Sequence, residues 1–293
     1  MRLEKNAAHS IASAYIELLK PNIMSLVLVS TVLGYFLGGD GIDDYSKLLI
    51  TLLGTALTAG GAGALNHYLE RDADKLMQRT KNRPLPSGLI PPGNALLFGI
   101  LLVFLGTIIL VTQINLLTGF LSILTVFLYV LVYTPLKKIT WLNTPIGSIP
   151  GALPPLGGWA AATGHLEPGA WIIFAIMFLW QHPHFYAIAW MCKDDYARAN
   201  FKMLPVIEPD GKRTIRQIFW HLTLLVPVSV LLYVEGSSGM IYVVGVIILT
   251  SLFLLSALPL AKGKSVEGAK LLLKSSVIYL PLLLILIIVD KLL

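Results

Sequence analysis

Nine long apolar stretches follow one another along this chain of 293 residues and limit the folds that it can adopt. A helix needs about 20 mainly apolar residues to cross the hydrocarbon core of a bilayer, and each stretch is close to that length. Charged residues make up only 13% of the chain, against about 25% in a soluble domain. We therefore expect an all-α integral membrane protein with nine transmembrane helices in a single domain, residues 1–293. The expected spans are residues 22–39, 48–66, 94–112, 115–134, 144–162, 169–191, 218–235, 239–259 and 270–289.

Basic residues fall almost entirely on one side of the expected membrane. All 22 lysines and arginines except Lys47 and Lys291 lie in the N-terminal segment, which holds Arg2, Lys5 and Lys20, or in connections on the same side. Because positively charged connections stay in the cytoplasm, the N-terminus is predicted to be cytoplasmic. This distribution explains the net charge of +6, so no nucleic-acid partner is expected. No targeting extension is visible, so we expect the inner (cytoplasmic) membrane of a prokaryote.

Three oxygen-bearing side chains stand four residues apart at the cytoplasmic end of the second span. If the helix continues, Asn66, Glu70 and Asp74 drift by only about 40° per step and share one face. A few hard oxygen ligands of this kind suit Mg²⁺, which keeps places for water and phosphate. The alternative is a solvated helix end with ordinary ion pairs, in which Glu70 and Asp74 would repel each other. Because a cation would relieve this repulsion, we favour a metal site.

A second charged cluster, residues 193–198, follows the sixth span on the same side of the membrane. Asp194 and Asp195 are expected to form a second metal-binding pair. Cations near both clusters can bind phosphate oxygens through charge-assisted hydrogen bonds, or they can simply set the topology. The cations predicted to bind phosphate are Lys81, Arg83, Lys137, Lys193 and Arg198. Together the two clusters indicate a site for a divalent metal and a phosphate ester, facing the cytoplasm.

The fifth span, residues 144–162, is interrupted by glycines and prolines. Helix-breaking residues are tolerated in a membrane where the helix is buried or lines a cavity. Close packing of helices through small residues would also explain them. The sequence leaves both interpretations open.

Two histidines, His182 and His184, flank Pro183 near the inner end of the sixth span. Histidine is rare inside a membrane and usually faces the interior of a bundle. The pair could bind a metal, transfer a proton, or form structural hydrogen bonds to a neighbouring helix. On a regular helix the two side chains would diverge, although Pro183 permits a local distortion.

At these motifs the chain resembles the UbiA superfamily of intramembrane prenyltransferases. The similar segments, about two-thirds of the chain, are Lys20-Pro21; residues 66–85, with RTKNRPL; Tyr133 with Lys137; IGSIPGALPPLGG at 146–158; and WQHPHFYAIAWMCKDDYARANFKMLP at 180–205. The resemblance implies a single UbiA-type domain of nine helices around a central cavity, with two Asp-rich motifs that bind Mg²⁺. The last segment is most similar to the branch of the superfamily that farnesylates haem. It implies transfer of a farnesyl group from farnesyl diphosphate to a vinyl group of haem b, with addition of water, to give haem O.

The resemblance also implies a role for each candidate residue. His182 and His184 would orient haem, through its iron or a propionate. Glu70 stands where the family more often has Asp, which keeps the carboxylate and lengthens its reach. The implied catalytic residues, which are also the metal ligands, are Asn66, Glu70, Asp74, Asp194 and Asp195. The implied diphosphate ligands are Lys81, Arg83, Lys137, Lys193 and Arg198.

Three other functions share part of this pattern. A prenyltransferase acting on a quinone or chlorophyll precursor would keep the metal motifs but not the PHF and KDDYARA segments. A transporter would suit the interrupted span and the histidines, but the acids lie at helix ends rather than near the midplane. A non-catalytic haem-binding chaperone would not need Asn66, Glu70 and Asp74. The expected partners are farnesyl diphosphate, haem b and the lipid bilayer, with a haem A synthase or a terminal oxidase assembly as a protein partner.

Overall fold

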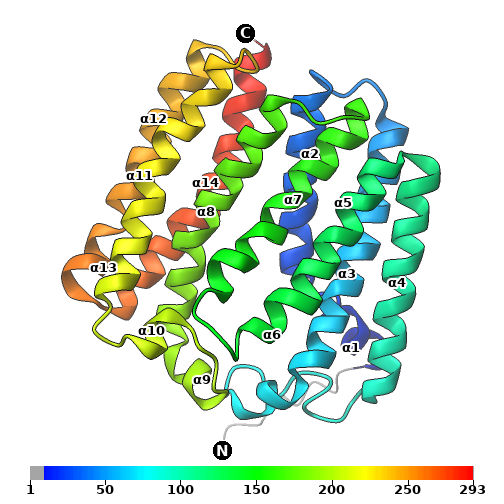
Figure 1. The fold of residues 1–293 in the computed structure, drawn as a ribbon, viewed down its shortest axis with the longest axis vertical. Helices are drawn as coiled ribbons and strands as arrows, with labels where there is room; N and C mark the ends of the chain where they lie inside the picture. The colour runs from blue at the N-terminus through cyan, green and yellow to red at the C-terminus, as the bar shows by residue number, and fades with distance from the viewer. Residues whose placement is uncertain (1–9, 293) are drawn as a thin grey trace, which may run out of the picture.

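Long helices run side by side through the molecule, as the computed structural model of residues 10–292 shows (Figure 1). These residues contain no β-strand. The long helices are α2 (Pro21–Gly38), α3 (Tyr45–Leu76), α4 (Pro92–Gln113), α5 (Leu116–Phe127), α7 (Asn143–Thr163), α8 (Pro168–Met191), α11 (Lys212–Val234), α12 (Met240–Leu255) and α14 (Val266–Leu292). The short helices are α1 (Ile11–Leu18), α6 (Thr134–Leu136), α9 (Lys193–Arg198), α10 (Leu204–Ile207) and α13 (Leu258–Gly263), and a π-helical segment, η1 (Leu128–Tyr133), follows α5.

Eight of the expected spans are confirmed as helices long and apolar enough to cross a membrane. The remaining span, residues 144–162, corresponds to α7, which lies among the long helices (Figure 1). This helix has 21 residues and is long enough to cross a membrane, but it is not apolar enough to count with the other eight. The all-α membrane fold is therefore confirmed, whereas the count of nine spans and the orientation of the termini stay predictions. Arg2 and Lys5, which contribute to the predicted orientation, lie outside the described residues.

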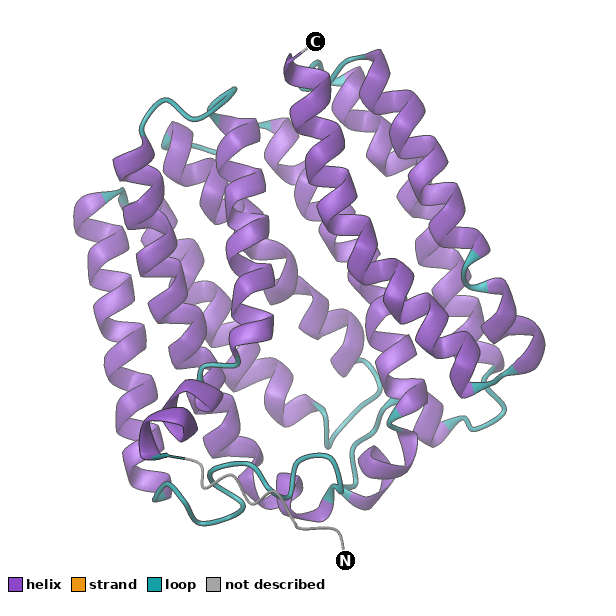
Figure 2. Ribbon diagram, turned by 180° about the vertical axis from the view of Figure 1, so that it is seen from behind, coloured by secondary structure: helices purple, strands orange, loops and turns teal. Residues whose placement is uncertain are grey.

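The short helices gather mainly at one end of the bundle. Helices α1, α6, α9 and α10 lie with the connection between α3 and α4 at the end opposite the C-terminus (Figures 1 and 2). The two charged clusters of the sequence, residues 66–84 and 193–198, belong to these segments and to the adjoining end of α3. The fold thus brings together charged segments that are far apart along the chain.

Helix α3 carries the first acidic motif on a continuous stretch of helix. It extends beyond the expected span and ends only at Leu76. Asn66, Glu70 and Asp74 are all buried on it, with exposed fractions of 0%, 6% and 0%. The prediction of a helix through these three residues is confirmed, and their burial excludes a solvated helix end.

Helix α7 is continuous although three prolines lie inside it, and it packs closely against α2. A Cβ atom on Gly34 of α2 would lie 1.8 Å from the carbonyl oxygen of Pro155. A Cβ on Gly158 of α7 would lie 2.0 Å from the carbonyl oxygen of Thr31. Other α7 residues line the cavity described below. Both interpretations of the interrupted span therefore hold: small residues allow close packing on one side and border a cavity on another.

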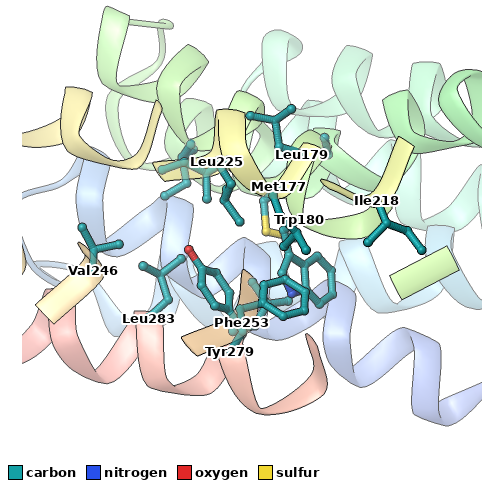
Figure 3. Close-up of a cluster of buried hydrophobic side chains, with 14 of the residues drawn as sticks. Met177, Leu179, Trp180, Ile218, Leu225, Val246, Phe253, Tyr279 and Leu283 are labelled. Carbon is teal, nitrogen blue, oxygen red and sulfur yellow. The ribbon is translucent and has the colours of Figure 1, made fainter. Parts of the chain in front are cut away.

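The largest apolar core lies among α8, α11, α12 and α14 (Figure 3). Met177 and Trp180 of α8 pack there with Phe253 of α12 and Tyr279 of α14. The Trp180 Nε1–H donates to the carbonyl oxygen of Ser276 at 2.9 Å, so this polar group is satisfied inside the core. The contact ties the cavity-lining helix α8 to α14, and this core supports one wall of the site.

Substitution of Gly34 by alanine is expected to destabilise the protein by about 1–3 kcal/mol, because α2 and α7 would have to separate. Thermal unfolding in detergent measures the loss. Gly157→Ala is the matched control on α7, since a Cβ there meets no atom within 4 Å. Equal unfolding temperatures for the two variants would contradict the close contact between α2 and α7.

Candidate active site

A cavity of about 390 Å³ opens among α2, α3, α5, η1, α7 and α8. Its apolar part is bordered by residues such as Leu26, Val27, Leu121, Val126 and Leu153. Its charged part lies at the end of the bundle where the short helices gather. The charged residues that line it are Lys20, Glu70, Asp74, Arg79, Arg83 and Lys137. The cavity thus joins a charged mouth to an apolar interior.

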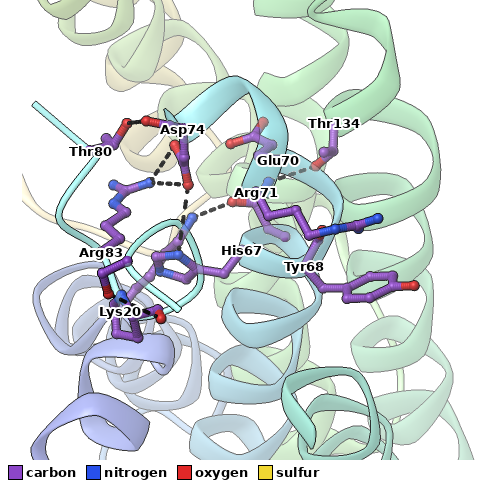
Figure 4. A network of polar contacts seen from close by, with 12 residues as sticks. Lys20, His67, Tyr68, Glu70, Arg71, Asp74, Thr80, Arg83 and Thr134 are labelled. Carbon is purple, nitrogen blue, oxygen red and sulfur yellow. Dashed lines mark hydrogen bonds and ion pairs between the residues drawn. The ribbon is translucent and has the colours of Figure 1, made fainter. Parts of the chain in front are cut away.

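Asn66, Glu70 and Asp74 of α3 each accept a hydrogen bond from a cation, and the three cations come from different segments. Figure 4 shows Lys20 and Arg83 on this side of α3. The Lys20 ammonium, at the junction of α1 and α2, donates to Asn66 Oδ1. The guanidinium of Arg83, in the connection after α3, donates to both carboxylate oxygens of Asp74 at 3.0 and 3.1 Å. Lys137, which follows α6, forms the third pair.

The pair of Glu70 and Lys137 is the most buried of these contacts. The Lys137 ammonium donates to Glu70 Oε1 at 2.6 Å, and Lys137 itself is only 9% exposed. Burial alone would lower the pKa of Lys137, but the Glu70 carboxylate beside it raises the pKa above its usual value. The ring of Tyr133 lies 4.6 Å from the same ammonium. Lys137 is therefore charged, and each member of the pair compensates the other.

Lys20 adopts a left-handed backbone conformation, with φ of 52°, immediately before α2. Non-glycine residues avoid this region by about 1–2 kcal/mol, so the turn is specific. It directs the side chain to Asn66 and into the cavity lining. Burial lowers the pKa of Lys20 to about 7 in the protein alone. An anion bound beside it would favour the charged form.

The π-helical segment η1 places two aromatic rings at the charged mouth. The π-helical turns precede Pro135, which has no N–H to continue a regular α-helical pattern. The Thr134 hydroxyl donates to the carbonyl oxygen of Tyr129 at 2.8 Å, so this backbone carbonyl has a hydrogen-bond partner within the widened turn. Tyr129 and Tyr133 both line the cavity, with ring centroids 5.8 Å apart.

The two aspartates of the second charged cluster lie outside the cavity lining, although Tyr196 between them and Arg198 belongs to it. Asp195 accepts hydrogen bonds from the backbone N–H groups of Gln78, at 2.8 Å, and of Arg79, at 3.3 Å, and it pairs with Arg198. Although partial burial opposes ionisation, these hydrogen bonds hold the pKa of Asp195 below its usual value. Its carboxylate thereby fixes the start of the connection that carries Arg83.

Five other predicted ligands do not line the cavity in this structure, and one of them is Asn66, which is fully buried outside the lining. Lys81 and Asp194 are exposed, and Arg198 forms its ion pair with Asp195. The Lys193 ammonium lies 5.7 Å from the ring of Trp190. The metal role of Asp194 and Asp195, and the phosphate role of Lys81, Lys193 and Arg198, therefore stay predictions.

The two predicted haem-orienting histidines point to different surroundings, because α8 continues through Pro183. His184 lines the cavity. His182 is fully buried outside the lining, and its ring stacks on that of His221 of α11 with centroids 3.7 Å apart. Its Nδ1 is 2.6 Å from the carbonyl oxygen of Phe178. The structure therefore separates the two histidines, and their haem role stays a prediction.

Several cavity residues had no predicted role: Lys20, Arg79, Tyr129 and Gln181. Lys20 carried a usable signal, a single cation just before the proline that starts a span. Arg79 stands in the same basic segment as Lys81 and Arg83, and sequence alone does not tell which of these side chains turns inward. Tyr129 and Gln181 lie within apolar spans and give no signal of their own.

The donor set at the mouth fits a divalent metal only together with a phosphate ligand. Among residues 10–292, no three His, Cys, Asp or Glu side chains form a group that could hold a metal ion. Mg²⁺, however, usually binds one or two carboxylates together with substrate phosphates rather than a cage of protein ligands. Glu70 and Asp74, with the amide oxygen of Asn66, provide such a partial set. Lys20, Arg83 and Lys137 outnumber the two carboxylates, so the mouth favours an anion.

Comparison with known proteins identifies the class of protein that this fold and site belong to. The model of the UbiA prenyltransferase family matches residues 27–278, and the chain belongs to this family. A protoheme IX farnesyltransferase of Solibacter usitatus is 45% identical over 286 residues, which cover 94% of this chain and 98% of that protein. A protoheme IX farnesyltransferase of Salinibacter ruber is 48% identical over 276 residues, with the same shares covered.

Solved structures share the fold at low sequence identity. A digeranylgeranylglyceryl phosphate synthase superimposes with a TM-score of 0.79 at 20% identity, covering 96% of this chain and 98% of that one. A UbiA homologue of Archaeoglobus fulgidus, bound to DMAPP and Mg²⁺, gives a TM-score of 0.75 at 17% identity, with 95% and 99% covered. At these identities the similarity establishes the helical arrangement alone.

Substitution of Lys137 by methionine is expected to destabilise the protein by about 3–5 kcal/mol, because it leaves the buried Glu70 carboxylate without its partner. Adding Glu70→Gln should recover much of this loss, as both charges are then gone. Lys138→Met, at the exposed neighbouring lysine, is the control and should leave the unfolding temperature unchanged. If Lys137→Met and Lys138→Met have the same unfolding temperature, the pair of Glu70 and Lys137 has no structural role.

Substitution of Asp195 by alanine is expected to loosen the connection between α3 and α4, because two backbone N–H groups lose their acceptor. Hydrogen exchange of residues 77–91 should become several-fold faster, in line with the net contribution of about 0.5–1.5 kcal/mol for a hydrogen bond. Asp194→Ala, at the exposed neighbour, should leave the exchange unchanged. Unchanged exchange in Asp195→Ala together with weaker Mg²⁺ binding would instead make Asp195 a metal ligand.

Proposed function

We propose that this protein transfers a farnesyl group from farnesyl diphosphate to a vinyl group of haem b (protohaem IX), with addition of water, to give haem O. The observation that carries the proposal is the cavity, which joins a mouth of two carboxylates and four cations to an apolar interior. A prenyl diphosphate has the same division into a charged head and an apolar chain. The name of the similar proteins from Solibacter usitatus and Salinibacter ruber supports haem b as the acceptor.

Mg²⁺ is the proposed cofactor, held by Glu70 and Asp74 with the amide oxygen of Asn66. When bound, the metal neutralises charge on the leaving diphosphate. Arg83 and Lys137 already contact these carboxylates, so we expect them to bind the diphosphate oxygens. Their charges favour the transition state, because negative charge develops on the leaving group as the bond to carbon breaks.

The apolar interior protects the allylic cation that forms when diphosphate leaves. Leu121, Val126 and Leu153 border the space that the farnesyl chain would fill, so water is displaced as the chain binds. The rings of Tyr129 and Tyr133 line the same cavity next to the charged mouth. Their faces attract positive charge, so they can stabilise the cation without reacting with it as a carboxylate would.

The cellular setting is also part of the proposal. The charged mouth is proposed to face the cytoplasm at the inner membrane, and the basic residues of the short connections support this orientation. Farnesyl diphosphate would present its head group there while its chain lies among apolar residues. A haem A synthase or a terminal oxidase assembly stays the proposed protein partner.

Asp74→Asn is expected to lower turnover by about a hundredfold or more, because it removes charge from the metal-binding set while the shape of the side chain is kept. Purified protein is incubated with haem b, farnesyl diphosphate and Mg²⁺, and the extracted haem is analysed by mass spectrometry. EDTA should abolish the product of the wild-type protein. Asp72→Asn, at an exposed residue on the same helix, is the matched control and should keep normal activity.

Retained activity of Asp74→Asn across a Mg²⁺ titration would remove Asp74 from the metal site. Diphosphate release only with a quinone precursor as acceptor would replace haem b while leaving the prenyltransferase chemistry in place. If no acceptor supports diphosphate release, the proposed function fails.

A further inference from the structure

Two neutral side chains of α8, Gln181 and His184, line the same cavity as the charged pairs. They are three residues apart and therefore neighbours on one side of the helix. Neither side chain takes part in the ion pairs at the mouth. The hydrogen bonds that each one makes to its surroundings decide what it offers to the cavity.

Gln181 offers only a hydrogen-bond acceptor. Its Nε2 donates to the carbonyl oxygen of Ser148 at 2.9 Å and to that of Met177 at 3.0 Å. Both hydrogens of the amide are thereby used, which leaves Oε1 as the free atom of the amide, beside Gly151 in the cavity lining. No hydrogen bond to Oε1 is formed within the described chain.

Gly151 of α7 makes room for this amide oxygen. A Cβ atom at residue 151 would lie 2.0 Å from Gln181 Oε1. Gly151 also lines the cavity. The absence of a side chain therefore lets Oε1 occupy a fixed position at the cavity wall.

His184 likewise offers an acceptor, because Ser276 fixes its tautomer. The Ser276 hydroxyl donates its one hydrogen to the carbonyl oxygen of Leu273 at 2.6 Å. In the 2.8 Å contact between His184 Nδ1 and Ser276 Oγ, the proton must therefore lie on Nδ1. The other ring nitrogen, Nε2, keeps its lone pair. Stacking on Trp180, with centroids 5.4 Å apart, holds the ring in place.

We propose that Gln181 Oε1 and His184 Nε2 bind the water molecule that adds to the farnesylated vinyl group, and that His184 accepts the proton released. Two neighbouring acceptors can take both hydrogens of one water, which leaves an oxygen lone pair free to attack a carbocation. This inference rests on the proposed function, because only an acceptor that is hydrated after prenylation needs such a water.

The proposed step balances in atoms and electrons. The bond between C1 of the farnesyl group and the diphosphate oxygen breaks, and the diphosphate keeps the electron pair. C1 bonds to the terminal vinyl carbon, which leaves the positive charge on the inner vinyl carbon. The water oxygen bonds to that carbon, and the resulting oxonium gives one proton to His184 Nε2. The product is an alcohol, and no redox partner is needed.

The test measures how the product divides between the alcohol and an alkene that is lighter by one water. Without a positioned water and a base, the cation loses a carbon-bound proton instead. Gln181→Met and His184→Phe should each lower the ratio of alcohol to alkene about tenfold or more. Ser276→Ala, which frees the His184 tautomer, should lower the ratio less. The ratio of alcohol to alkene depends only on the protein that is active, because it is measured on the product formed. Partial misfolding therefore lowers the yield without changing this ratio.

The matched controls are Gln217→Met and His221→Phe, which remove the same side-chain types from α11, outside the cavity lining. Both should keep the wild-type ratio. A wild-type ratio in Gln181→Met and His184→Phe would overturn the water site. A changed haem absorption spectrum in His184→Phe with an unchanged ratio would make Nε2 an iron ligand and likewise overturn it. Complete loss of product in both variants with a wild-type ratio in Ser276→Ala would also count against it.

Failure of the proposed function is distinguishable from failure of this inference. If the wild-type protein forms no farnesylated haem, both fall. If it forms haem O and the variants give the same ratio of alcohol to alkene as the wild type, only the proposed water site is wrong.

Discussion

The pairing of α3 oxygens with cations from elsewhere in the chain is the interaction on which the site depends. Charges are costly in a membrane unless they are paired. Asn66, Glu70 and Asp74 draw in Lys20, Lys137 and Arg83, which come from three separate segments. The pairs thereby fix the entry to α2, the end of α6 and the connection after α3 around a common cavity. The cations that compensate the carboxylates are also those proposed to bind the diphosphate, so in this proposal the same side chains serve stability and substrate binding.

If the proposed substrate binds at these pairs, the charged side chains must exchange partners. The mouth holds two carboxylates and four cations, so positive charge is in excess and can attract an anion. Glu70 and Asp74 would hold the metal, and Lys137 and Arg83 would then be free to bind phosphate oxygens. This exchange needs only small side-chain movements, because the backbone on both sides is anchored. Asp195 supports this anchoring by accepting two backbone hydrogen bonds from the connection that carries Arg83.

Much of this arrangement could be predicted from the sequence. The spans follow from apolar length, and the shared face of Asn66, Glu70 and Asp74 follows from helical periodicity, because both depend on local spacing alone. The position of Lys20 depends on a left-handed turn, which no local pattern specifies. The inward direction of Arg79 depends on the contact of its own N–H with Asp195, more than a hundred positions away in the sequence. Residue type shows what a side chain can do, whereas its partners decide where it points.

Gln181 shows why the neutral part of the cavity matters as much as the charged part. A carboxylate beside the cation on the inner vinyl carbon would trap it as an ester, and an ammonium would oppose its formation. An amide oxygen gives a partial negative charge that does neither, and it needs no counter-ion inside the membrane. A neutral imidazole adds the ability to take a proton once the oxonium has formed. Separation of a charged mouth, which helps diphosphate to leave, from neutral acceptors deeper along α8 would therefore order the two steps, departure of the leaving group first and capture by water second.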